Sequence, residues 1–183
     1  TMIFAYLFPV LIGAGTITLP LIIEYVLPNY RQGLLPAQIL MFSSFFYSLI
    51  FMWQFFLVAL YKQIKMVQFN LMAVIISIGL NVLFVRGFGM GLNGIALSGV
   101  LSHFALSTIL ITYVFSYYTK NAKEHAIFFL KLYFPIFWVL GILIIFKIFF
   151  DYKYISLGGD MLRAAIFNVV LILCCMPLLY YIN

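Results

Sequence analysis

The chain has 183 residues, of which 67% are hydrophobic and only 8% are charged, and its formal net charge is +6. An average soluble domain is about 45–50% apolar and about 25% charged, so this composition excludes a water-soluble globule, which needs far more polar surface. The ten Lys and Arg residues lie at the ends of apolar runs and form no basic face. Their distribution excludes nucleic acid as a partner and favours a lipid bilayer.

Six apolar segments are each long enough to cross a membrane, which takes about 20 residues per helix. In chain order they cover residues 2–23, 36–60, 67–85, 91–117, 127–149 and 161–182. The connections are short and hold turn-forming or charged residues, as at 27–33 and 158–160. The predicted fold is all-α, an integral membrane helical bundle of six transmembrane helices.

Polarity divides these segments into two sets. The first four carry Ser, Thr, Asn, Gln and His at membrane depth, whereas the last two are nearly pure Ile, Leu, Phe and Val. Polar groups in hydrocarbon must face protein or water. We therefore predict a working bundle of four helices in residues 1–117 and a peripheral terminal helix pair in residues 118–183.

The cations predict an orientation. Two compact loops, 61–65 and 119–125, hold Lys62, Lys65, Lys120 and Lys123, and the positive-inside rule places such loops in the cytoplasm together with both chain ends. The first segment is too long for a signal peptide and lacks a cleavage site. Because the chain opens with Thr1, we expect it to begin partway through a longer protein.

Five polar residues are candidates for substrate binding. Asn70 and Asn81 are eleven positions apart on one predicted helix and share a face, where they either bond neighbouring helices or contact a ligand. His103 is the one histidine inside a span; it either contacts a phosphate, relays a proton or serves as a hydrogen-bonded packing residue. Arg86 either binds an anion as a bidentate fork or is an interfacial anchor. Gln54 is the fifth candidate, chosen for its depth and polarity.

A stripe of small residues recurs every fourth position at Gly94, Ser98 and Ser102. Such a stripe permits close approach of two helices, and lining of a pathway is the alternative. Adjacent Cys174 and Cys175 are expected to be free thiols. No carboxylate lies mid-membrane, and the sequence shows no metal-ligand cluster and no nucleophile with a base. We therefore predict a non-enzyme without catalytic residues, metal or cofactor.

The order of several motifs resembles the C-terminal half of polysaccharide flippases, the lipid-linked O-antigen and capsule exporters of the MATE-like superfamily. The turn PNYRQG at 28–33 precedes the amphipathic helix start at Ile39 and Leu40, and a basic turn follows at 62–65. Then come Asn81 and the glycine-rich helix start GLNGIALS at 91–98. Ile95 stands where the family often has alanine. The resemblance covers residues 1–117, and the last two segments are similar to an extra terminal pair in such proteins.

The resemblance implies one lobe of a two-lobe transporter in the bacterial inner membrane, with the N-terminal lobe of the same protein as its partner. Such a protein moves an isoprenoid-pyrophosphate-linked oligosaccharide across the bilayer by alternating access. The implied topology also places the 61–65 and 119–125 loops in the cytoplasm. Three alternatives remain open at this point: a multidrug or small-solute exporter of the same superfamily, a membrane-embedded glycosyl- or acyltransferase, and a structural membrane subunit.

Overall fold

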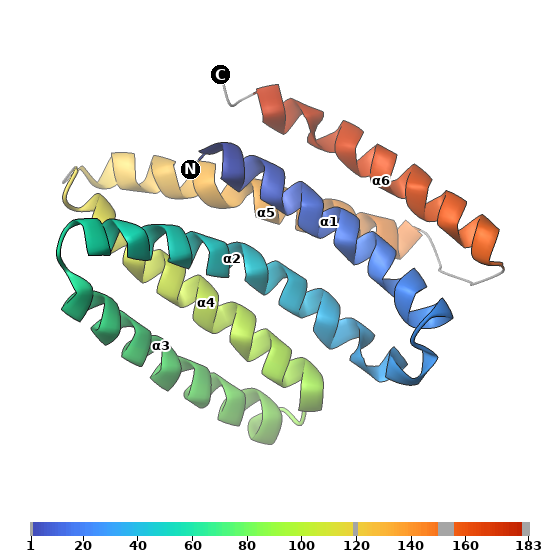
Figure 1. The fold of residues 1–183 in the computed structure, drawn as a ribbon, viewed down its shortest axis with the longest axis horizontal. Helices are drawn as coiled ribbons and strands as arrows, with labels where there is room; N and C mark the ends of the chain where they lie inside the picture. The colour runs from blue at the N-terminus through green and yellow to red at the C-terminus, as the bar shows by residue number, and fades with distance from the viewer. Residues whose placement is uncertain (1, 119–120, 150–155, 181–183) are drawn as a thin grey trace. The chain divides into compact units, whose positions relative to one another are not determined.

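The computed structural model describes residues 2–118, 121–149 and 156–180, and all regular structure in these ranges is helical. The long helices are α1 (Met2–Tyr25), α2 (Leu34–Ala59), α3 (Gln63–Val82), α4 (Gly91–Phe115), α5 (Ala122–Phe149) and α6 (Leu157–Tyr180) (Figure 1). All six of these helices in the described ranges are long and apolar enough to cross a membrane. The predicted all-α fold is confirmed, and the chain is a multi-pass membrane protein.

Helices α2, α3, α5 and α6 begin earlier than their apolar runs predict, and polar residues precede the last two. The loop predicted at 158–160 is wrong, because these residues form the first turn of α6. The Ser156 hydroxyl accepts a hydrogen bond from the Gly159 N–H (3.3 Å), as a helix-capping serine does. At the start of α5, the side-chain oxygen Oδ1 of Asn121 similarly accepts from the Lys123 N–H (3.1 Å). Polar capping residues therefore extend both helices beyond the apolar segment.

Two short helical elements replace predicted loops. The turn predicted at 27–33 is the 3₁₀ helix η1 (Pro28–Gly33), and α3 ends in a π-helical turn, η2 (Leu83–Gly87). Gly89 and Gly91 have φ values of +63° and +54° in the following turn, a conformation that glycine adopts at no steric cost. In the predicted loop 119–125, residues 119–120 lie outside the described residues, as do residues 150–155 and both chain ends.

Chain contacts define two compact units, one of Thr1–Leu34 with Phe128–Asn183 and the other of Leu35–Ile127. The predicted division at 117/118 was drawn from polarity, and these units do not follow it, because α1 groups with α5 and α6. Helix α1 packs closely against both helices at Gly13. A Cβ at this position would lie 2.8 Å from the Leu171 side chain of α6 and 2.9 Å from the Val139 side chain of α5.

Polar contacts complete the first unit. The Tyr25 hydroxyl of α1 donates to the Asp160 carboxylate of α6 (2.6 Å), and Arg163 lies 3.7 Å from the other carboxylate oxygen. Trp138 of α5 donates to the Cys174 carbonyl of α6 (3.3 Å). Cys174 and Cys175 are free thiols, as predicted. Asp160 is 1% exposed, so it belongs to the α1–α6 contact and not to a loop.

The second unit consists of α2, α3 and α4 with the first turn of α5. Figure 1 shows α3 and α4 running antiparallel and side by side, joined at the Gly89–Gly91 turn, with α2 along the same pair. Because all five candidate site residues lie in this unit, the candidate site is built within it.

Candidate functional site in the α2–α4 unit

The small-residue stripe of α4 forms a close contact with α3 near their shared turn. A Cβ on Gly94 would lie 3.1 Å from the Cβ and 3.2 Å from the carbonyl carbon of Phe84. One helical turn along, the Ser98 hydroxyl donates to the Asn81 side-chain oxygen (2.6 Å). Gly94 and Ser98 are both buried. The predicted helix–helix contact of this stripe is confirmed at these two positions.

Further from the turn, the same antiparallel register produces a cavity. It brings Ser102 to the level of Ser77, and in the next turn it brings Leu106 to the level of Ala73. All four residues line a cavity of about 340 Å³. Three of them are small, so their side chains do not fill the space between the helices. The end of the stripe at Ser102 is therefore a cavity wall.

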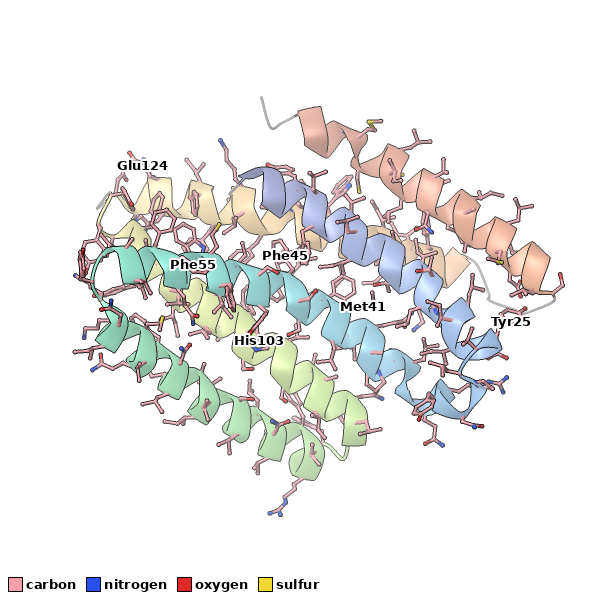
Figure 2. The ribbon with its side chains drawn as sticks, in the orientation of Figure 1. Tyr25, Met41, Phe45, Phe55, His103 and Glu124 are labelled. Carbon is pink, nitrogen blue, oxygen red and sulfur yellow. The ribbon has the colours of Figure 1, made fainter. Side chains whose placement is uncertain are left out.

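Helix α2 supplies the other wall and two polar bridges. Ser43 Oγ of α2 lies 2.6 Å from His103 Nδ1 of α4, and Figure 2 shows His103 on α4 beside α2. Gln54 Nε2 of α2 donates to Asn70 Oδ1 of α3 (2.9 Å). Gln54, Asn70 and His103 all line the cavity. Interhelical hydrogen bonding, one of the two roles predicted for Asn70, is confirmed.

Aromatic rings border these polar groups. Tyr47 and Phe51 line the cavity, and their ring centroids are 5.8 Å apart. Tyr47 also lies 5.5 Å from the His103 ring. Phe55 continues the same row one turn along α2, with its ring 5.7 Å from Phe51, but it does not line the cavity. The cavity therefore combines aromatic surface with amide, hydroxyl and imidazole groups.

The cavity carries no formal charge of the Lys, Arg, Asp or Glu type among the described residues that line it. The carboxylates that the structure describes lie near helix ends, at Glu24, Glu124 and Asp160. Glu24 is paired with Arg31. A ligand held here meets uncharged hydrogen-bonding groups, which can act as both donors and acceptors.

Two of the predicted site residues lie elsewhere. Asn81 is bonded to Ser98 in the close α3–α4 contact and does not line the cavity. Arg86 is exposed in the π-helical turn η2 and does not line it either. Such π-turns are frequent at functional sites, but the structure brings only Gln54, Asn70 and His103 of the five candidates together.

A basic–aromatic cluster marks the opposite end of α3 from Arg86. Lys62 Nζ donates a hydrogen bond to the Tyr117 hydroxyl and lies 4.1 Å from the centre of the same ring. The Tyr117 hydroxyl donates to that of Tyr113 (2.9 Å). The bond to Tyr117 raises the pKa of Lys62, and the bond from Lys62 lowers the pKa of Tyr117. Tyrosine and lysine at a span end are typical of membrane interfaces.

Sequence reasoning missed two residues of the site. Ser43 does not line the cavity but is the hydrogen-bond partner of His103, and Ala73 lines the cavity and leaves space by its small size. A signal existed for the aromatic wall, because Tyr47, Phe51 and Phe55 are spaced by four and must share one face of a helix. Nothing comparable identifies Ser43 or Ala73, because their roles depend on which helix lies opposite.

No protein-family model, curated protein or solved structure matches this chain. The fold and the cavity therefore define the class directly: a multi-pass helical membrane protein with an uncharged polar cavity within its α2–α4 unit.

Proposed function

We propose that the chain is part of a membrane transporter that flips a lipid-linked oligosaccharide across the bacterial inner membrane by alternating access. The observation that carries the proposal is the cavity between α2, α3 and α4, where hydroxyl, amide, imidazole and aromatic groups converge inside membrane-spanning helices. Burying polar groups in hydrocarbon is costly, so a purely structural subunit has no use for such a cavity. A transporter that carries a polar molecule does use such a cavity, because the cavity binds that molecule.

The proposal includes a second lobe, the N-terminal lobe of the same protein, because alternating access requires a surface against which this lobe moves. It also places the Lys62 end of α3 in the cytoplasm and Arg86 at the opposite face, in keeping with the positive-inside rule. Arg86 remains the candidate for binding the pyrophosphate, because Arg86 is exposed and a guanidinium can donate hydrogen bonds to two phosphate oxygens at once.

Transport is preferred to catalysis. An intramembrane glycosyl- or acyltransferase needs a positioned acid, base or nucleophile. His103 is bonded to a serine hydroxyl, and no carboxylate lines the same cavity in the part of the chain that the structure describes. A multidrug or small-solute exporter is the second candidate function, favoured by the aromatic wall of Tyr47 and Phe51. Efflux of aromatic cations, without any effect on glycan export, would identify that function.

The test is glycan-export complementation in the full-length protein. Ala73→Leu fills the cavity and His103→Ala removes its imidazole, so both variants are expected to reduce export at unchanged membrane abundance. The matched control is Gly79→Leu on the same helix, where an added side chain meets nothing within 4 Å of its Cβ. Export at the wild-type level in both cavity variants would refute the proposal.

A further inference from the structure

We infer that the α2–α4 cavity holds an uncharged sugar ring, and that the pyrophosphate of the transported molecule binds elsewhere. This inference rests on the proposed function and names the part of the substrate that occupies the cavity. It is carried by three observations: the hydrogen-bonding pattern of Gln54 and Asn70, the aromatic pair Tyr47 and Phe51, and the absence of a cationic side chain among the described lining residues.

The amide pair presents donors beside an acceptor. The bond from Gln54 Nε2 to Asn70 Oδ1 leaves the Gln54 carbonyl oxygen as an acceptor, and it leaves the second Gln54 N–H and the Asn70 NH₂ as donors. Reversing both amides leaves the same combination. Two neighbouring sugar hydroxyls satisfy both groups at once, because each hydroxyl donates and accepts. A pyrophosphate only accepts, and it would place its oxygens against the remaining amide carbonyl.

The aromatic pair suits the other surface of a sugar. A pyranose has an apolar face of C–H groups beside its hydroxyl edge, and an aromatic ring covers such a face without losing a hydrogen bond. Tyr47 and Phe51 line the cavity alongside the amide pair. The volume of about 340 Å³ lies at the small end of ligand pockets, which is the scale of a sugar unit and not of an isoprenoid chain.

The uncharged lining disfavours the pyrophosphate at the same position. Burying an anion without a paired cation is costly, even where neutral groups donate hydrogen bonds to it. No Lys or Arg lines the cavity among the described residues, and Arg86 belongs to the turn at the end of α3. The structure therefore separates the group that recognises the sugar from the cations available for the phosphates.

The test is site-specific photo-crosslinking in the full-length protein, in cells that make the lipid-linked glycan with a radiolabelled sugar. p-Benzoylphenylalanine replaces Phe51, which lines the cavity, or Phe55, which lies one turn along the same exposed row and serves as the matched control. Mild acid then cleaves the bond between sugar and pyrophosphate. An adduct attached through the sugar keeps its label, and an adduct attached through the lipid or phosphates loses it.

We expect an acid-stable sugar adduct at Phe51 and a yield at least several times lower at Phe55. An adduct that loses its sugar in acid would overturn the inference while supporting the proposed function. Lack of any adduct at Phe51 would also overturn the inference, and export by the unmodified protein then decides the proposed function separately.

Amide variants provide a second measurement. Removing one hydrogen-bonding side chain with Gln54→Leu or Asn70→Leu is expected to lower the adduct yield by about threefold to tenfold. Gln68→Leu is the control, because Gln68 is exposed on α3 and does not line the cavity. Equal yields in all three variants, at equal membrane abundance, would contradict the role given to the amide pair.

Discussion

The close contact between α3 and α4 at Gly94 provides a direct test of the structure, through the substitution Gly94→Ala. The added methyl carbon would lie 3.0 Å from the Cβ of Met90, 3.1 Å from the Cβ of Phe84 and 3.2 Å from the Phe84 carbonyl carbon. None of these atoms moves by a side-chain rotation, since all belong to the backbone or are fixed to it. The helices must separate to admit the methyl group.

The magnitude follows from a comparison with Gly79→Ala on α3, where an added Cβ meets nothing within 4 Å. Both changes gain the same helix propensity, about 1 kcal/mol per Gly→Ala. This gain cancels in the difference between the variants, and what remains is the cost of overpacking, typically about 1–3 kcal/mol. We therefore expect Gly94→Ala to be less stable than Gly79→Ala by about 1–3 kcal/mol.

The assay is reversible unfolding of the full chain in bicelles, by steric trapping or denaturing detergent, with each variant measured at the same protein-to-lipid ratio. Equal free energies of unfolding for the two variants would show that α3 and α4 are not in contact at Gly94. In that case the register from which the cavity is built would also be wrong, because the levels of Ser77 and Ser102 are counted from this contact.

Three further predictions concern other parts of the molecule. Ala73→Leu is expected to raise the free energy of unfolding by about 0.5–2 kcal/mol, as cavity-filling changes commonly do, although it reduces export. Lys62→Gln is expected to shift part of the tyrosinate absorbance to higher pH, because Lys62 lowers the pKa of Tyr117 below its ordinary value of 10.0; alkaline spectrophotometric titration measures it. Tyr25→Phe is expected to cost about 1–3 kcal/mol, because it removes a donor from the buried Asp160 carboxylate.

Each of these has a contradicting outcome. A loss of stability in Ala73→Leu would mean that the space beside Ala73 is already filled. For Lys62→Gln, superimposable titration curves of variant and wild type would show that Lys62 does not bond to Tyr117. Tyr30→Phe is the control for the α1–α6 contact, because Tyr30 is 66% exposed. An equal loss of stability in Tyr25→Phe and Tyr30→Phe would show that the bond to Asp160 does not stabilise the protein.

The sequence predicts the helices well because their signal is local. Twenty or more apolar residues in a row specify a span wherever its neighbours lie, and all six spans are found. The ends are less predictable, because a cap such as Ser156 depends on one hydrogen bond, to Gly159 N–H. Local sequence does not determine which helices pack together. Nothing in the polarity of α1 shows that its Gly13 faces Leu171 and Val139.

The candidate site follows the same rule. Depth and polarity select Gln54, Asn70 and His103 correctly as groups that need a protein or ligand partner, but they select Asn81 for the same reason. Only the register separates them, because Asn81 is opposite Ser98 where the helices touch. Arg86 was chosen for its charge, and charge alone says nothing of how far a side chain lies from a cavity.

Small residues have opposite effects along α4, and the neighbouring helix decides which one occurs. At Gly94, α3 closes against the missing side chain, so the small residue produces contact. At Ser102 the residue is also small, but there α3 presents the small residues Ser77 and Ala73, and α2 is linked through Ser43 to His103 and through Gln54 to Asn70. These two bonds link α2 to both partners beside the cavity. Interhelical hydrogen bonds of the kind that packing residues make are thus found at the cavity itself.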